Sequence, residues 1–145
     1  MSDTFHLERF VAVQDPVYAE VVAELRAGRK TSHWMWFVFP QLAGLGRSAM
    51  AQRYAVSSLD EARAYFRHLL LGSRLLECVA LVNAVEQRTA EQIFGPIDAQ
   101  KLQSCLTLFE LASNGNVEIV AALDKYYDGR RDATTLRLLD IKHSN

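Results

Sequence analysis

Apolar side chains recur every three or four residues along most of this sequence, which is the spacing of one face of an α-helix. No segment shows four or more clean alternations of apolar and polar residues between hairpin turns, the pattern typical of half-buried β-strands. The pattern therefore predicts an all-α protein. The apolar stripes of the longer predicted helices are Val17, Val21, Val22 and Leu25; Ala62, Tyr65, Phe66 and Leu69; Leu75, Leu76, Val79, Leu81, Val82 and Val85; and Leu102, Cys105, Leu106 and Phe109.

Residues that favour helix ends divide these stripes. Asp15 followed by Pro16 predicts a helix start, with the aspartate as N-cap and the proline in the first turn. Gly28 predicts the end of the same helix. Other boundaries are predicted in the same way: capping boxes at Ser58 with Glu61 and at Thr89 with Gln92, helix starts at Asp98, Asn116 and Asp132, and a helix end at Gly72.

The apolar segment 34–39 is too short for periodicity to distinguish a buried strand from a turn of helix. Ser32 as a cap and Pro40 as a terminator favour the helix. The chain contains no internal repeat, no low-complexity tract and no linker long enough to separate domains. We therefore predict a single compact domain over residues 1–145, with about seven short helices and an ordered core at about 5–140.

Composition and charge narrow the function classes. The 145 residues carry a net charge of -1, which lacks the basic excess of a nucleic-acid-binding protein. The start of the sequence is polar and acidic, unlike a secretory signal, and no run of about 18 apolar residues is present. We therefore expect a cytoplasmic protein that does not bind membranes.

Metal and cofactor sites have no signature in the sequence. Cys78 and Cys105 are far apart and lie on apolar helical stripes, which is typical of free buried thiols in a reducing compartment. The histidines, cysteines and carboxylates show no metal-ligand spacing. Gly44 and Gly46 are not followed by the Gly-Lys-Ser/Thr of a phosphate loop. We expect neither a metal nor a cofactor.

An aromatic block lies within a segment that is free of Asp and Glu. Residues 32–41 contain both tryptophans, and residues 26–53 contain five cations and no carboxylate. Aromatic surface among unopposed cations suits an anionic ligand that carries a ring. We therefore predict a small-ligand domain with an aromatic and cationic cleft that binds a phosphorylated or nucleotide-like metabolite. The five cations are Arg26, Arg29, Lys30, Arg47 and Arg53.

Each candidate residue has a role in this hypothesis. Lys30, Arg47 or Arg53 would hold the anion, and Trp36 would stack on the ring. The sequence assigns no reaction, and His33 is the candidate general acid or base if one occurs. Together with Gln41 as a polar contact and Lys101 on a facing helix, the candidate ligand-binding residues are Lys30, His33, Trp36, Gln41, Arg47, Arg53 and Lys101.

Two other interpretations of the aromatic block stay open. Exposed aromatic side chains of the block would form a hot spot for a partner protein. Alternatively, both indoles belong to the core, each with its N–H group hydrogen-bonded. Arg29 and Lys30 also have a structural explanation, because the helix macrodipole favours cations near a helix C-terminus.

Motifs spread over the sequence match those of a known family: Gly28-Arg29-Lys30, Ser32-His33-Trp34-Met35-Trp36-Phe37, Phe39-Pro40-Gln41, Gly44-Leu45-Gly46, Ile93-Phe94-Gly95, Asp98, Lys101 and Lys125-Tyr126-Tyr127. On these residues the chain resembles the bacterial domain of unknown function 1810, over roughly residues 5–139. The resemblance implies an all-α single domain from bacteria and no established activity.

Two features of that family bear on this chain. Its members are sometimes labelled calpastatin-like, meaning inhibitors of cysteine proteases, but a calpastatin is largely disordered and this sequence is apolar-rich and capped like a folded domain. The family usually has His-Pro where this chain has His68-Leu69. Without the proline, we expect the helix to continue to Leu71.

Overall fold

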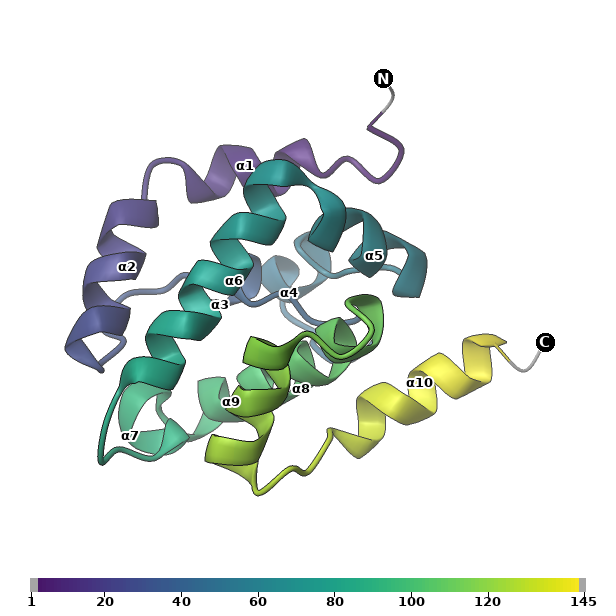
Figure 1. Ribbon diagram of the computed structural model, residues 1–145. Helices are drawn as coiled ribbons and strands as arrows, with labels where there is room; N and C mark the ends of the chain where they lie inside the picture. The colour runs from purple at the N-terminus through teal and green to yellow at the C-terminus, as the bar shows by residue number, and fades with distance from the viewer. Residues whose placement is uncertain (1–2, 144–145) are drawn as a thin grey trace.

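The structure, a computed structural model, describes residues 3–143 and contains ten helices in that range (Figure 1). Seven of them have seven residues or more, and the described residues contain no strand, so the all-α prediction is confirmed. The helices are α1 (Glu8–Gln14), α2 (Tyr18–Ala27), α3 (Met35–Val38), α4 (Ala49–Arg53), α5 (Leu59–Arg67), α6 (Leu69–Ala84), α7 (Ala90–Phe94), α8 (Pro96–Ala112), α9 (Val117–Tyr127) and α10 (Ala133–His143).

The two longest helices, α6 and α8, organise the others. Helix α6 packs against α2, α5 and α9, and α8 packs against α5, α7, α9 and α10. Figure 1 shows α6 crossing the middle of the molecule, with α10 reaching out along one edge toward the C-terminus. Within residues 3–143, no helix is long and apolar enough to cross a membrane.

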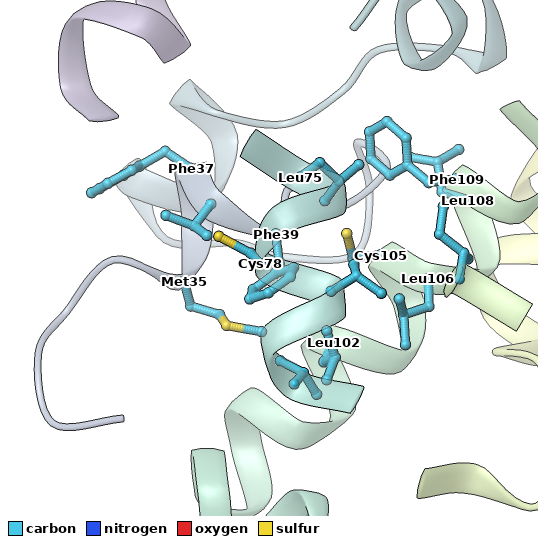
Figure 2. Packing of buried hydrophobic residues seen from close by; sticks show 14 of the residues in the cluster. Met35, Phe37, Phe39, Leu75, Cys78, Leu102, Cys105, Leu106, Leu108 and Phe109 are labelled. Carbon is cyan, nitrogen blue, oxygen red and sulfur yellow. The ribbon is translucent and has the colours of Figure 1, made fainter. Parts of the chain in front are cut away.

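The core lies between α6, α8 and the segment that contains α3 (Figure 2). Leu75 and Cys78 of α6 face Leu102 and Cys105 of α8, and Phe39 closes this cluster from the side of α3. All five side chains are buried, which removes a continuous apolar surface from water and stabilises the fold.

The start of α2 differs from the prediction, whereas its end is confirmed. Asp15 is not an N-cap, because α2 begins at Tyr18 and its N-cap residue, Val17, provides no side-chain hydrogen bond. The Asp15 carboxylate instead accepts a hydrogen bond of 2.7 Å from Arg74. Gly28 ends the helix in the left-handed conformation, with a φ of 72° that glycine adopts without strain.

The prediction that one helix continues from Ser58 to Leu71 is wrong. The chain turns at His68, whose extended ψ of 127° ends α5 and begins α6. Nδ1 of His68 accepts hydrogen bonds from the backbone N–H groups of Leu70 and Leu71, so the histidine caps α6. Leu69 therefore occupies the first helical position of α6, where proline is favoured in proteins. The cap that His68 provides explains how the turn forms without a proline.

Gly72 does not close a helix but lies inside α6. A Cβ atom at this position would lie 2.1 Å from the carbonyl oxygen of Phe66 in α5. The glycine is therefore required because α5 and α6 approach each other closely at this point.

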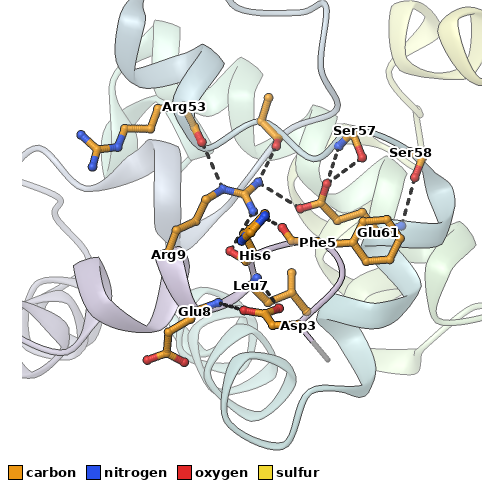
Figure 3. A network of polar contacts seen from close by, with 11 residues as sticks. Asp3, Phe5, His6, Leu7, Glu8, Arg9, Arg53, Ser57, Ser58 and Glu61 are labelled. Atoms are coloured by element: carbon orange, nitrogen blue, oxygen red, sulfur yellow. Dashed lines mark hydrogen bonds and ion pairs between the residues drawn. The ribbon is translucent and has the colours of Figure 1, made fainter. Parts of the chain in front are cut away.

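The capping box at Ser58 and Glu61 is only half formed. Ser58 accepts a hydrogen bond from the backbone N–H of Glu61, but the Glu61 carboxylate accepts from Ser57 and forms an ion pair of 3.0 Å with Arg9. Figure 3 shows that the Arg9 guanidinium also donates to backbone carbonyl oxygens on two other segments. These acceptors are Phe5 and His6 before α1, Arg53 at the end of α4 and Ala55 after it.

The remaining predicted helix starts are confirmed, with two exceptions. The capping box at Thr89 and Gln92 is complete, and Asn116 caps α9; Asp132 accepts a hydrogen bond from the backbone N–H of Thr135. Asp98 is not the N-cap of α8, which begins at Pro96 after Gly95. Ser32 does not cap α3, because that helix has no side-chain cap.

Candidate functional site

The buried carboxylate of Glu24 in α2 holds the start of the aromatic block by hydrogen bonds. Its Oε1 accepts hydrogen bonds from the backbone N–H groups of Thr31 and Ser32 and from Nε1 of Trp34, at 2.7, 2.9 and 3.0 Å. Burial by itself raises the pKa of Glu24, but hydrogen bonds from Ser32, Thr31 and Trp34 outweigh it and lower the pKa from its ordinary value to about 2. The segment is thus held by a charged acceptor that stays ionised at neutral pH.

The two tryptophans lie in different environments. Trp34 is 1% exposed and belongs to the core, with its N–H group satisfied by Glu24. Trp36 is half-buried and lines a pocket of about 130 Å³, which we call the aromatic pocket. Its lining combines Met35, Trp36, Phe39, Gln41 and Leu42 with Ala43, Gly44, Gly46, Ala51, Gln52, Tyr54, Ala55 and Lys101.

A second pocket adjoins the first and is lined mostly by polar side chains. This polar pocket, of about 290 Å³, shares Gln41, Gly46 and Lys101 with the aromatic pocket. The two pockets therefore meet at these three residues and form one cleft. The other residues that line the polar pocket are Leu45, Ile97, Gln100, Ser104, Asp132 and Thr134.

A short loop closed at its base forms one wall of the cleft. An isolated parallel bridge joins Leu42 to Val56, with a hydrogen bond of 2.8 Å from Ala43 N to Val56 O and another from Val56 N to Gln41 O. Between these ends the chain forms α4 and brings residues 43–55 over the aromatic pocket. Gly46 packs so closely on this wall that an added Cβ would lie 2.5 Å from the Cβ of Ala51.

Lys101, at the junction of the two pockets, contacts both a carboxylate and an aromatic ring. Its Nζ lies 5.5 Å from the ring centroid of Trp36 and 3.8 Å from Oδ1 of Asp98. The other oxygen of Asp98 lies 2.9 Å from Nζ of Lys30, which in turn lies 5.0 Å from the ring of Trp34. One aspartate thus positions two lysines, each beside a tryptophan.

The structure brings together three of the seven predicted ligand-binding residues. Trp36, Gln41 and Lys101 line the cleft. The carboxamide of Gln41 makes no hydrogen bond to any other residue in the range 3–143, so its donors and acceptor are available. These three side chains, from α3, the loop after it and α8, converge on one point.

The other four predicted residues line neither pocket. The Lys30 side chain is 7% exposed and is engaged by Asp98 and by the carbonyl oxygen of Ser32. His33 and Arg47 are exposed; Arg47 directly follows the pocket residue Gly46. Arg53 is exposed as well, with its guanidinium 5.6 Å from the ring centroid of Tyr54. The five cations of segment 26–53 therefore do not form a common anion clamp.

Sequence reasoning missed three residues of the site. Tyr54 is buried between Phe10 and Phe37 and lines the aromatic pocket, yet nothing local distinguishes it from a core tyrosine. Asp132 and Asp98 were interpreted only as helix caps, although they place carboxylates in and beside the cleft. The spacing of Asp98 and Lys101, three residues apart on one helix, is the signal that predicts their contact.

The two cysteines are buried thiols outside the cleft. Burial raises the pKa of the Cys78 thiol to about 12 and that of Cys105 well above its usual range, so neither forms a thiolate at neutral pH. Among the residues described here, no three His, Cys, Asp or Glu side chains are grouped so that they could hold a metal ion. What the cleft offers is an apolar pocket, one ammonium group, the carboxylate of Asp132 and several neutral hydrogen-bonding groups.

A family model described as a protein of unknown function (DUF1810) matches residues 4–139 of the chain. The chain belongs to the DUF1810 family. It is also similar to a solved structure, the crystal structure of the conserved hypothetical protein Rv1873 from Mycobacterium tuberculosis. The two sequences are 59% identical, the TM-score is 0.93, and the match covers 94% of this chain and 98% of that one.

These comparisons confirm the family resemblance and the fold. The DUF1810 match spans almost the whole described chain, and its relative comes from a bacterium, as the resemblance implied. No curated protein matches the sequence.

Proposed function

We propose that this domain binds a small, ring-bearing, anionic metabolite in the cleft formed by the aromatic and polar pockets. The observation that carries the proposal is the position of Lys101, whose ammonium group lies beside Trp36 at the junction of the two pockets. An aromatic face and a cation at one point attract a ligand that combines a ring with a negative charge.

The volume of the aromatic pocket fits one ring. An apolar cavity of about 150 Å³ is known to bind benzene, and the aromatic pocket measures about 130 Å³. Its lining includes Met35, Phe39 and Leu42, which are buried and apolar. A ring would therefore enter against Trp36 and bury its apolar surface there.

The polar groups at the junction would orient the ligand. The Lys101 ammonium would pair with the anionic group, and the free carboxamide of Gln41 would donate to or accept from it. This proposal keeps a ring-bearing anion as the ligand, as predicted from the sequence, but moves the charge contact from Lys30, Arg47 and Arg53 to Lys101. We propose no catalytic role for His33, which lies outside both pockets.

The interaction-module interpretation has less support from this geometry. It requires tryptophans on an open surface, whereas Trp34 is buried and Trp36 is half-buried inside a pocket. A concave site with an apolar interior and a few polar groups is typical of small-molecule binding.

The test is a screen of single-ring carboxylates, nucleotides and phosphorylated metabolites by thermal shift and tryptophan fluorescence. The expected result is saturable stabilisation by at least one compound, with the response lost in Trp36→Ala and in Lys101→Met. Arg63→Met is the matched control, because it removes a cation that pairs with the exposed Asp60 and lines neither pocket. The proposal is overturned if no compound stabilises the protein, or if Arg63→Met abolishes the response as Lys101→Met does.

A further inference from the structure

The charges that face the cleft nearly cancel. Lys101 is the one cation among the described residues that line the two pockets, and Asp132 lines the polar pocket with a carboxylate. Asp98 lies 3.8 Å from the Lys101 ammonium and already balances part of its charge. A ligand thus meets one partly balanced positive charge and one negative charge.

Asp98 and Asp132 are both fixed in place. The ammonium group of Lys30 lies 2.9 Å from Oδ2 of Asp98, and the Lys30 side chain is itself only 7% exposed. This ion pair restrains the Asp98 carboxylate from turning away from Lys101. Oδ2 of Asp132 accepts hydrogen bonds from the backbone N–H and the hydroxyl of Thr135, at 2.9 and 2.6 Å. Neither carboxylate is free to move away when an anion arrives.

We infer that this cleft selects its ligand by charge, accepting a single-ring compound with one negative charge and rejecting a doubly charged phosphate monoester. The inference rests on the proposed function, because it concerns the ligand of the same site. A monoanionic group would pair with Lys101, whereas the oxygens of a doubly charged phosphoryl group would also face Asp132 or Asp98 without a further cation. Like charges repel more strongly in a partly desolvated cleft than in bulk water.

The same geometry narrows the ligand class to a monocarboxylate, or a similar monoanion, that carries one aromatic ring and hydroxyl groups. The volume of the aromatic pocket, about 130 Å³, is close to that of a cavity of about 150 Å³ known to bind benzene, which favours a single ring. The polar pocket is lined by Gln100, Ser104, Asp132 and Thr134, side chains that can donate to or accept from hydroxyl groups. A hydroxyl group would also donate to the carboxylate oxygen of Asp132 that does not bind Thr135, which an anion cannot do.

The experiment compares three probes that share one ring and differ in charge. They are benzyl alcohol, phenylacetate and phenyl phosphate, the last doubly charged at pH 8 because the second pKa of a phosphate monoester is about 6. Affinities are measured by titration calorimetry with the full chain at low ionic strength. We expect phenylacetate to bind at least about tenfold more tightly than either of the other probes.

Two charge-removing variants test the origin of the selection. Asp132→Asn keeps a side chain that can cap α10 and should improve phenyl phosphate binding about tenfold, with a smaller effect on phenylacetate. Asp128→Asn is the matched control, because it changes the net charge equally at an exposed left-handed position (φ 53°) that asparagine tolerates and that lies outside the cleft. Asp128→Asn should leave all three affinities unchanged.

The outcomes separate this inference from the proposed function. Tighter binding of phenyl phosphate than of phenylacetate by the wild-type protein overturns charge selection, as does an equal effect of Asp132→Asn and Asp128→Asn. Equal binding of benzyl alcohol and phenylacetate overturns it too, while leaving a ring-binding pocket in place. Absence of binding by all three probes and by the screened metabolites overturns the proposed function itself.

Discussion

Nζ of Lys30 lies 2.9 Å from Oδ2 of Asp98, and this ion pair ties the loop after α2 to the first turn of α8. Lys30 is one of the cations that, in the sequence, suggest an anion site. In the structure it instead positions a carboxylate, which in turn lies beside Lys101 at the cleft. The lysine that lines the cleft and the lysine that supports the fold therefore share one aspartate.

Lys30→Met is expected to destabilise the protein by about 1–3 kcal/mol, because it leaves the mostly buried carboxylate of Asp98 without its nearest partner. Lys101→Met is the control: its contact with Asp98 is longer and more exposed, so we expect a change within about 1 kcal/mol. Urea unfolding of both variants checks this. Equal losses would contradict the structural role of Lys30, and the double variant Lys30→Met/Asp98→Asn should be less unstable than the sum of its single changes.

Glu24→Gln is expected to reduce stability in a pH-dependent way. The folded-state pKa of Glu24, about 2, lies below its ordinary value of 4.5, so the ionised carboxylate stabilises the folded state fully above pH 4.5. This contribution is lost as the pH falls through the folded-state pKa. The difference in Tm between wild type and Glu24→Gln should therefore be largest at pH 7 and shrink as the pH approaches 2, as measured by circular dichroism. A difference that is constant from pH 7 to pH 2 would show that the charge of Glu24 contributes nothing.

Arg9→Ala is expected to cost about 1–3 kcal/mol, because one guanidinium satisfies four backbone carbonyl oxygens and the buried Glu61 carboxylate. Arg63→Ala is a matched control, since Arg63 pairs only with the exposed Asp60 at 3.5 Å and such surface pairs contribute about 0–1 kcal/mol. Chemical denaturation measures the loss of stability in each variant. A loss in Arg63→Ala as large as that in Arg9→Ala would contradict the central role of the Arg9 network.

Gly72→Ala should destabilise the protein, although alanine is favoured over glycine in a helix by about 1 kcal/mol. The added Cβ would lie 2.1 Å from the Phe66 carbonyl oxygen, and relieving such overpacking typically costs about 1–3 kcal/mol. Ser73→Ala, at the next and exposed position of α6, is the control and should be close to neutral. An increase in Tm for Gly72→Ala would show that α5 and α6 separate easily.

Local patterns predict most helices but not every turn between them. Thr89 with Gln92, and Asn116, are confirmed as caps because each side chain bonds to backbone within its own first turn. Asp15 and Asp98 carry the same kind of signal, yet Arg74 and Lys30 bind them from other parts of the chain. The turn at His68 escapes a sequence-based prediction because a histidine cap replaces the more familiar His-Pro pattern.

The candidate site was also predictable only in part from local patterns. Helical spacing places Trp34 and Trp36 on different faces, with Trp36 on the face of the candidate His33, and this selected Trp36 as the candidate for a ligand site. Trp36 does line a pocket, although His33 does not. Gln41 and Lys101 were identified from motifs of the family, and the cleft does contain them. That the cations of segment 26–53 do not converge could not be predicted, since Lys30 pairs with Asp98, which approaches it only after α8 packs against the rest of the fold.

The two walls of the aromatic pocket differ in how firmly they are built. Met35 and Phe39 belong to the core, whereas α4, on the opposite wall, buries none of its five residues and is held mainly at its ends, by the Leu42–Val56 bridge and by the Arg9 hydrogen bonds to Arg53 and Ala55. A segment with few buried contacts opens at a lower free energy than the whole domain unfolds. Amide protons of α4 should therefore exchange with deuterium long before those of α6 and α8, and a bound ring would slow that exchange. The pocket can adapt its width to different ring substituents while the core of the protein remains unchanged.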